Sequence, residues 1–235
     1  MSDADGLLLM SALAVKDPLD ALVRDTETTR HLALDTRYEP TAVIERAIAE
    51  GARPDIVVCT APAMERLVAQ GVIDPGSVHV LAQSSIGVAI APGGRAPDLS
   101  SVDALVSSLL AARAVAYSRT GASGQSFARL IERLGIADQV NARAVIIEKG
   151  FVAETLLDGR ADLAIQQLSE LATVAGVEVV GPLPEGAQDR IVIAAGVATT
   201  AVDSPAAGAV HEALKSARMV RLLLAAHLEP PDGRR

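Results

Sequence analysis

The segment Ala116-Tyr-Ser-Arg-Thr-Gly-Ala-Ser-Gly-Gln125 is rich in groups that can hold an anion. A predicted strand ends at Ser118, a loop with two glycines follows, and apolar spacing then predicts a helix over Ser123–Leu134. A helix start presents free backbone N–H groups and a partial positive charge, and glycine lets a ligand approach the backbone. Arg119 can clamp a carboxylate through two parallel hydrogen bonds. The other donors of this segment are Thr120, Gly121 and Ser123.

Two more specific kinds of site, and one purely structural role, are alternatives to anion binding at this segment. A Walker A loop needs Gly-Lys-Ser/Thr at the helix start, and no Lys stands there. A nucleophile elbow needs Gly-x-Ser-x-Gly, whereas Gln125 takes the last place. In the structural alternative, Ser123 only caps the helix and the glycines only turn the chain. The density of donors favours the anion site.

A second group of candidates comes from the amino-terminal third of the chain. Ser11 follows a predicted strand, and ligands of open α/β sheets sit at the carboxyl ends of strands. Lys16 stands at the next predicted helix start, where pairing with Asp20 one turn later is the structural alternative. Thr41 and Thr60 occupy equivalent loop positions, and each alone is typical of a helix N-cap.

A third group follows later strands. Gln166 and Gln167 come directly after an apolar strand and can donate amide N–H groups to ligand oxygens without adding charge, although such pairs are also common on helix surfaces. Glu148 beside Lys149 supplies an acid and a base, or a solvated charge pair. The four histidines show no ligand spacing, and the single cysteine has no partner, so no metal site or internal disulfide is predicted.

Short apolar segments alternate with amphipathic ones along the whole chain, which predicts an α/β fold. A long helix is predicted over Ser204–Ala226. The segments Val78–Pro92 and Arg190–Thr200 are long and free of helical pattern, so each could leave one sheet and enter a second. Pattern alone leaves two architectures open: two lobes with a cleft at the hinge, or a single open sheet. The predicted strands are Gly6–Ser11, His31–Arg37, Asp55–Thr60, Ser85–Ala91, Ala114–Ser118, Arg143–Glu148, Asp162–Gln166, Glu178–Val180 and Arg190–Ala198.

Composition excludes several classes of protein. Half of the 235 residues are hydrophobic and 21% are charged, which is typical of a soluble globular protein. The net charge of -8 argues against nucleic acid as a partner, because binding phosphates requires a basic face. With 2% aromatic residues and no Trp, stacking platforms are also excluded. We therefore expect a small anionic ligand held by hydrogen bonds.

The first residues of the sequence indicate in which cell compartment the protein is expected. Residues 1–6 are polar and acidic and lack the basic and apolar regions of an export signal, while Leu7–Val15 is too short to span a bilayer. We expect a cytoplasmic protein without membrane insertion, or a periplasmic one if a leader has been removed.

Four segments together resemble the type II periplasmic binding-protein fold, and more narrowly its molybdate-binding-protein-like branch. These are Ser11-Ala-Leu-Ala-Val-Lys-Asp-Pro-Leu19, Asp55-Ile-Val-Val-Cys-Thr60, Gly87-Val-Ala-Ile-Ala-Pro92 and Ala194-Ala-Gly-Val-Ala198. The resemblance implies a two-lobe α/β fold with the ligand in a cleft between the lobes. Lobe 1 would comprise residues 1–84 and 193–235, and lobe 2 residues 85–192.

The resemblance also implies roles for individual residues. Ser11 matches a first-loop hydroxyl, Thr41 a second-loop donor, and Thr120–Ser123 the helix start of the second lobe. Gln167 falls where molybdate binders usually have Tyr, and Arg119 is a further departure from their pattern. A guanidinium suits a planar carboxylate better than a tetrahedral oxyanion, so an organic acid is the expected ligand.

The strings Ala14-Val-Lys16, Ser118-Arg-Thr-Gly-Ala-Ser-Gly124 and Gln166-Gln167 are similar to a branch of this family that includes aconitate isomerase. That resemblance implies a 1,3-proton shift between the cis and trans forms of an unsaturated tricarboxylate, with no cofactor. Lys16 is then the expected base, because burial opposite Arg119 would favour its neutral form, and Glu148 is the reserve. The alternatives are a non-catalytic molybdate- or tungstate-type receptor that serves an ABC permease and, less favoured, a cytoplasmic sensor.

Overall fold

The computed structural model describes residues 6–25 and 33–231 and divides the chain into two compact units. Unit 1 comprises Met1–Gln83 and Val192–Arg235, and unit 2 comprises Ser84–Ile191. Each unit is built on its own sheet, so the predicted α/β class is confirmed. The predicted strand over His31–Arg37 lies in part outside the described residues and is observed as Leu34–Tyr38.

Unit 1 contains a six-stranded sheet in the order β11-β4-β10-β3-β1-β2. Strands β1 and β2 and strands β1 and β3 pair in parallel, and β10 runs antiparallel to β3. The strands are β1 Leu7–Ser11, β2 Leu34–Tyr38, β3 Ile56–Thr60, β4 His79–Ser84, β10 Ile191–Val197 and β11 Leu228–Glu229. The helices are α1 Lys16–Asp25, α3 Thr41–Ala49, α4 Ala61–Ala69, α10 Pro205–Leu214 and α11 Ala217–Ala225, with short 3-10 turns Leu13–Val15, Pro75–Ser77 and Thr199–Ala201.

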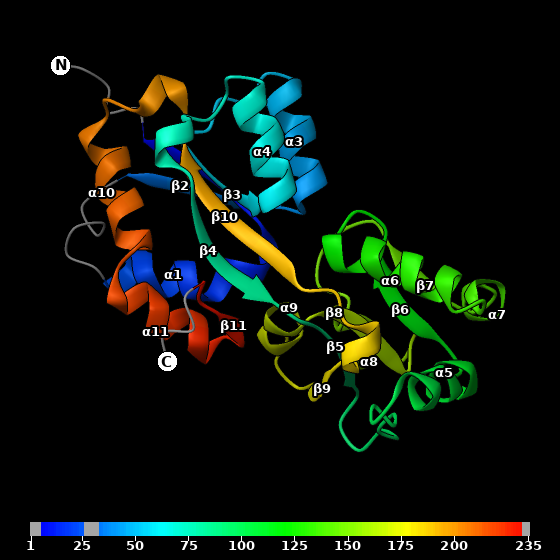
Figure 1. Cartoon of the computed structure of the whole chain (residues 1–235). Helices are drawn as coiled ribbons and strands as arrows, with labels where there is room; N and C mark the ends of the chain where they lie inside the picture. The colour runs from blue at the N-terminus through cyan, green and yellow to red at the C-terminus, as the bar shows by residue number, and fades with distance from the viewer. Residues whose placement is uncertain (1–5, 26–32, 232–235) are drawn as a thin grey trace. The chain divides into compact units, whose positions relative to one another are not determined.

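Both faces of the unit 1 sheet are covered by helices, which explains why its central strands are apolar at nearly every position. Alternate residues divide between the faces: Val58 packs with the buried side chains of α1, α10 and α11. Its neighbour Val57 packs with those of α3 and α4. Figure 1 shows the two groups of helices on opposite sides of β3 and β10.

Unit 2 contains a five-stranded sheet in the order β7-β6-β8-β5-β9. Strands β7, β6 and β8 are parallel, and β5 is antiparallel to both β8 and β9. The strands are β5 Ile86–Ile90, β6 Val115–Ser118, β7 Val145–Ile147, β8 Leu163–Gln167 and β9 Glu178–Pro182. The helices are α5 Val102–Ala111, α6 Ala122–Arg133, α7 Ala137–Asn141, α8 Glu154–Leu157 and α9 Leu168–Thr173, with a 3-10 turn at Glu185–Ala187.

In unit 2, too, alternate residues of a strand pack against helices on opposite faces of the sheet. Tyr117 and Ile165 pack with the buried residues of α5, α6 and α7, including Phe127, whose ring meets that of Tyr117 edge-on. On the other face, Ala116 and Ala164 pack with α8 and α9. The small alanines on this face allow the two short helices to lie close to the sheet.

One predicted helix differs from the sequence-based expectation, and one long segment agrees with it. The long helix predicted over Ser204–Ala226 is wrong, because the chain forms two helices that break at Lys215 and Ser216. The Ser216 hydroxyl accepts a hydrogen bond from Met219 N and so starts α11 as an N-cap. The segment Val78–Pro92 leaves one sheet and enters a second, as expected, because its two strands β4 and β5 belong to different sheets.

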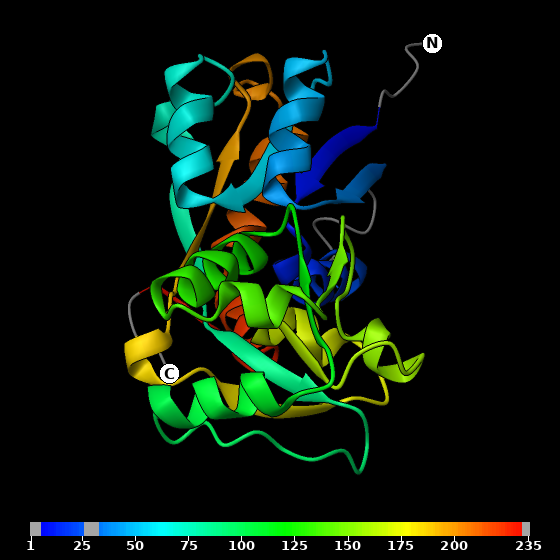
Figure 2. The ribbon, with the colours of Figure 1, turned by 90° about the vertical axis from the view of Figure 1, so that its right-hand side faces the viewer.

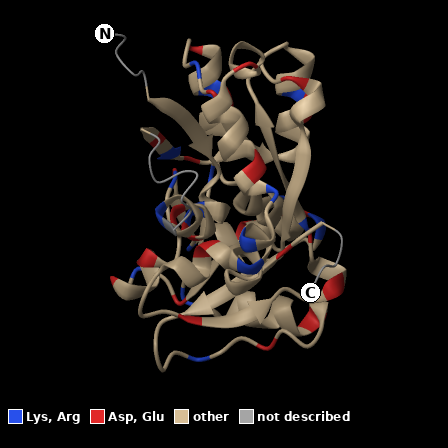
Figure 3. Cartoon of the chain, turned by 90° about the vertical axis from the view of Figure 1, so that its left-hand side faces the viewer, with Lys and Arg blue, Asp and Glu red and all other residues tan. Residues whose placement is uncertain are grey.

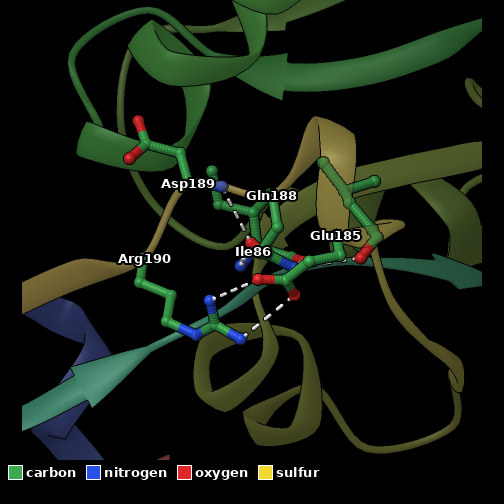
Figure 4. A network of polar contacts seen from close by, with 6 residues as sticks. Ile86, Glu185, Gln188, Asp189 and Arg190 are labelled. Carbon is green, nitrogen blue, oxygen red and sulfur yellow. Dashed lines mark hydrogen bonds and ion pairs between the residues drawn. The ribbon is translucent and has the colours of Figure 1, made fainter. Parts of the chain in front are cut away.

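Gln188 fixes the segment that precedes β10 to the start of β5 (Figure 4). Its side-chain oxygen accepts from Ile86 N at 2.8 Å, and its nitrogen donates to Ile86 O at 2.9 Å. Arg190 and Glu185 form a two-bonded ion pair across the same turn, with distances of 3.0 and 3.2 Å. Strands β4 and β10, which begin and end the excursion into unit 2, are neighbours in the unit 1 sheet (Figure 2).

Charged residues of both signs lie mainly on helices and loops, and most strands carry none (Figure 3). Within the described ranges, no helix combines the length and the apolar character needed to cross a membrane.

Candidate functional site

The unit 1 candidates gather at one edge of its sheet. Ser11, Tyr38 and Thr60 are the last residues of β1, β2 and β3, and Ser11 is in register with Tyr38 and with Val58. Because these strands are parallel, their carboxyl ends meet at this edge. Ser11 is fully buried, and its hydroxyl donates to Ala12 O at 3.1 Å.

Thr41 and Thr60 lie next to each other at the same edge. The backbone N–H of Thr60 donates to the Thr41 hydroxyl at 3.3 Å. Thr60 occupies the N-cap position of α4, but its side chain makes no capping hydrogen bond; Thr41 is the first residue of α3, behind Pro40. Neither side chain therefore acts as the N-cap acceptor that the structural alternative described.

Lys16 begins α1 and forms an ion pair with Asp20, at 2.6 Å. Its ammonium also lies 5.1 Å from the centre of the Tyr38 ring, and the Tyr38 hydroxyl donates to the other oxygen of Asp20. Burial, followed by the hydrogen bond to Asp20, raises the pKa of Tyr38 far above its ordinary value. Lys16 would have to leave Asp20 before it could take a proton from a substrate.

The unit 2 candidates gather at the carboxyl edge of the other sheet. Ser118 ends β6 and is in register with Ile147, the last residue of β7. Ala116 is in register with Ala164 of β8, so Gln166 lies two residues farther along, at the level of Ser118. Glu148 follows β7 directly. One edge therefore brings together Ser118, Glu148 and Gln166.

The loop after Ser118 is held by the chain itself. The Ser118 hydroxyl accepts from Gly121 N at 3.1 Å, and the Thr120 hydroxyl donates to Glu148 O. The N-cap residue of α6 is Gly121, which has no side chain that could cap the helix. Ser123 lies in the first turn and is 1% exposed. The alternative in which Ser123 caps this helix is therefore wrong.

Arg119 pairs with Glu148: the Arg119 Nε lies 2.8 Å from the Glu148 Oε1. Both side chains are largely exposed, with 61% and 71% of their surface accessible. The Arg119 backbone N–H donates to Ile147 O at 2.8 Å, which fixes the start of the loop. Among the described residues, Glu148 is the partner found for this guanidinium, so its two terminal nitrogens are available to a carboxylate.

Gln166 and Gln167 are buried, at 2% and 5% exposure, so neither is a surface amide. Gln166 accepts from Val152 N at 2.8 Å and donates to Gly150 O at 3.0 Å, which binds the loop after β7 to the end of β8. Gln167 caps α9, and its backbone N–H and side-chain nitrogen both donate to Glu170 Oε2 at 3.3 Å.

Glu170 is a buried acid that the sequence analysis missed. Burial raises its pKa to about 7, although hydrogen bonds from Gln167 and Gln166 act in the opposite direction. The signal was present: Gln167 and Glu170 have the spacing of a capping box directly after an apolar strand. Sequence alone does not distinguish an exposed capping acid from a buried one.

Other parts of the described chain are less suited to this chemistry. A cavity of about 760 Å³ in unit 2 is lined by Ala112, Arg113 and Leu163 among others, at the amino ends of β6 and β8 and away from the residues above. Within the residues that the structure describes, no group of three or more His, Cys, Asp or Glu side chains could hold a metal ion.

Comparison with known proteins identifies the family. A family model described as bacterial extracellular solute-binding protein matches residues 7–228. The chain belongs to this family. Aconitate isomerase from Pseudomonas sp is 32% identical to it over 192 residues, which cover 81% of this chain and 72% of that protein.

Solved structures of other solute-binding proteins share its fold. The periplasmic molybdate-binding protein of Azotobacter vinelandii aligns with a TM-score of 0.79 and 21% identity, covering 96% of this chain and 100% of the other. The sulfate-binding protein of Mycobacterium tuberculosis aligns with a TM-score of 0.72 and 18% identity, covering 97% and 87%. The type II periplasmic binding-protein fold, with two lobes, is therefore confirmed for this solute-binding protein.

Proposed function

We propose that this protein binds a small di- or tricarboxylate and interconverts the cis and trans forms of an unsaturated tricarboxylate by an allylic proton shift. The observation that carries this proposal is its 32% identity to aconitate isomerase over 81% of the chain. The exposed guanidinium of Arg119, in the loop between β6 and α6, supports a carboxylate ligand rather than a tetrahedral oxyanion.

Each of the two edges described above would contribute groups that bind the substrate. On unit 2, the terminal nitrogens of Arg119 and the N–H groups of the first turn of α6 would bind carboxylates. On unit 1, hydroxyl groups would bind the opposite end of the substrate. The hydroxyl-bearing residues of this second set are Ser11, Thr41 and Thr60.

Two residues predicted from the sequence could move the proton, and each already has a partner. Lys16 is paired with Asp20 at 2.6 Å, and Glu148 is paired with Arg119 at 2.8 Å. Either would have to exchange its partner for the substrate. We place the reaction in the cytoplasm as part of this proposal, and subcellular fractionation tests that location.

A second function is supported by the structural neighbours. The fold of a molybdate-binding and a sulfate-binding protein is compatible with a receptor that binds an oxyanion without converting it. Such a receptor would serve an ABC permease in the periplasm.

Turnover distinguishes the two functions. The ultraviolet absorbance of trans-aconitate, followed with the protein present, should change until the cis–trans equilibrium is reached. A thermal-shift screen against both aconitates, citrate, sulfate and molybdate should show selective stabilisation by the aconitates, because a ligand that binds only the folded state raises Tm. Stabilisation by molybdate alone, without any absorbance change, would establish the receptor instead.

A further inference from the structure

The cavity of about 760 Å³ in unit 2 lies at the amino edge of the sheet. It is lined by the loop between β5 and α5, by one face of α5, and by residues at the starts of β6 and β8. Val115 and Leu163, which begin these two strands, are in register. Ser118 and Gln166 lie at the opposite ends of the strands, so the cavity is separate from the candidate site. Its volume falls within the range of small-molecule sites, about 300–1,000 Å³.

Helix α5 contributes only small side chains to this cavity. The residues of α5 that line it are Ala104, Ser107, Ser108 and Ala111. Their spacing of three and four residues places them on one face of the helix. The large side chains of Leu105 and Leu109 are instead buried in the core. Because the lining side chains are small, the space beside this face of α5 stays open.

The loop between β5 and α5 forms another wall and is fixed in place by two backbone donors (Figure 2). Gly94 N donates to Ala91 O at 2.9 Å, and Asp98 N donates to Ser108 Oγ at 3.0 Å. The second bond joins the loop to the face of α5 that lines the cavity. Residues 95–97 lie between the two bonds and line the cavity as well.

Apolar side chains supply much of the lining. Leu156, Ala161 and Leu163 are its buried members, each at most 4% exposed. The accessible alanines of the lining are Ala91, Ala96, Ala104, Ala111 and Ala112. A ligand with an apolar body would remove this alanine surface from water, which favours binding.

Four charged residues line the cavity, and three of them already have partners. The backbone N–H and the guanidinium of Arg113 both donate to Asp162, each at 2.7 Å. The same guanidinium donates to Gly159 O at 3.1 Å. Asp98 accepts from Ser100 N at 2.9 Å. These three residues therefore serve mainly to hold the walls of the cavity together.

Arg95 is the cation that remains for a ligand. It is exposed, and across residues 6–25 and 33–231 its guanidinium has no hydrogen bond or ion pair. A guanidinium presents parallel N–H donors that match the two oxygens of a carboxylate. The rest of the lining carries one cation, Arg113, and two anions, Asp98 and Asp162. A second anionic group on the ligand would find no further unpaired cation, so a single carboxylate is favoured over a polyacid.

We propose that this cavity is a second ligand site and that it takes a small monocarboxylate with an apolar body. The carboxylate binds Arg95, and the apolar body lies against the alanines of α5 and of the loop. The site uses none of the residues assigned to the tricarboxylate above. It is therefore independent of the proposed function, and its test needs no turnover.

The test is an NMR titration of the ¹⁵N-labelled full chain with phenylacetate. The probe should shift amide signals within residues 94–98, 104–113 and 159–163, and the shifts should saturate. Phenylacetamide has the same shape without the charge, so it should bind about 10-fold more weakly, because a charge-assisted hydrogen bond is lost. Phenylsuccinate, a dicarboxylate, should bind no more tightly than phenylacetate. Shifts confined to other residues would overturn the site, and equal binding of the amide or tighter binding of the dicarboxylate would overturn the ligand class.

Two variants test the residues that carry the proposal. Arg95→Ala should lose about 10-fold in affinity for phenylacetate, whereas Arg133→Ala, which changes an exposed arginine of α6 outside the cavity, should keep the parent affinity. Ala104→Leu should abolish saturable binding by filling the space beside α5. Its Tm should stay close to that of the parent, because leucine is a strong helix former and position 104 lies outside the core. Parent affinity in either Arg95→Ala or Ala104→Leu would overturn the proposal.

Discussion

Gly124 lies so close to Ser118 that a Cβ atom at position 124 would be 1.9 Å from the Ser118 carbonyl oxygen and 2.8 Å from its carbonyl carbon. The obstacle is backbone, so a side chain cannot rotate away from it. This approach brings the first turn of α6 against the end of β6. The space at Gly124 is thus occupied by the protein, and the glycine is required for the first turn of α6 to pack against the end of β6.

Gly124→Ala should therefore displace the start of α6 and destabilise unit 2 by about 1–3 kcal/mol, the usual range for overpacking a tight site. Urea unfolding measures the change. Gly208→Ala is the control, because a Cβ there meets nothing within 4 Å in helix α10. It should stabilise the protein by up to about 1 kcal/mol through helix propensity. Equal stability of Gly124→Ala and the parent would show that the loop can rearrange.

Arg119→Ala should weaken aconitate binding by roughly 10- to 100-fold, because charge-assisted hydrogen bonds contribute about 1.5–3 kcal/mol. Its ion pair with Glu148 is exposed, so the fold should change little in stability. Calorimetric titration gives the affinity. Arg46→Ala is the matched control, since Arg46 is an exposed arginine of α3 that lies 4.0 Å from Glu50. Unchanged affinity in Arg119→Ala would remove Arg119 from the site.

Lys16→Met separates the two proposed proton carriers, Lys16 and Glu148. If Glu148 moves the proton, this variant should keep measurable turnover, with weaker substrate binding. Complete loss of turnover with intact binding would instead assign the base to Lys16. Asp20→Asn removes the carboxylate that lies 2.6 Å from the ammonium, and it should change the Lys16-dependent part of binding without abolishing turnover.

His79 should make the protein less stable in acid. Burial, and then the nearby His211, lower the pKa of His79 to about 4. The two rings meet with His79 Nδ1 3.1 Å from His211 Nε2, which also lies 2.7 Å from Ser77 O. Above pH about 6.5 the His79 ring is neutral in both the folded and the unfolded state, so it does not make the stability depend on pH. Between about pH 6.5 and pH 4 only the unfolded state gains the proton, so the free energy of unfolding decreases as the pH is lowered.

The measurement for His79 is the difference in Tm between pH 7.5 and pH 5, for the parent and for His79→Gln. The variant should lose less on acidification, with about 2–4 °C corresponding to each kcal/mol in a chain of this size. An identical acid sensitivity in both proteins would assign the effect to other groups.

The strands were predictable because most are buried on both faces and form short, nearly continuous apolar runs. Elements whose ends depend on a single side-chain contact were not predictable. The break between α10 and α11 depends on Ser216, whose hydroxyl caps a second helix inside what the pattern predicts as one. A serine in an apolar periodic segment does not reveal whether it faces solvent or caps a new helix.

The candidate site, like the fold, was predictable only in part. The sequence by itself determined the α/β class, because strand periodicity is a local property. The family was inferred from the resemblance of quoted segments, and the groups that would hold an anion remain a prediction. Only the tertiary structure placed Ser118, Glu148 and Gln166 at one edge of a sheet and paired Lys16 with Asp20. It also buried the Glu170 side chain, and proton affinity in a buried carboxyl depends on neighbours that the sequence pattern does not reveal.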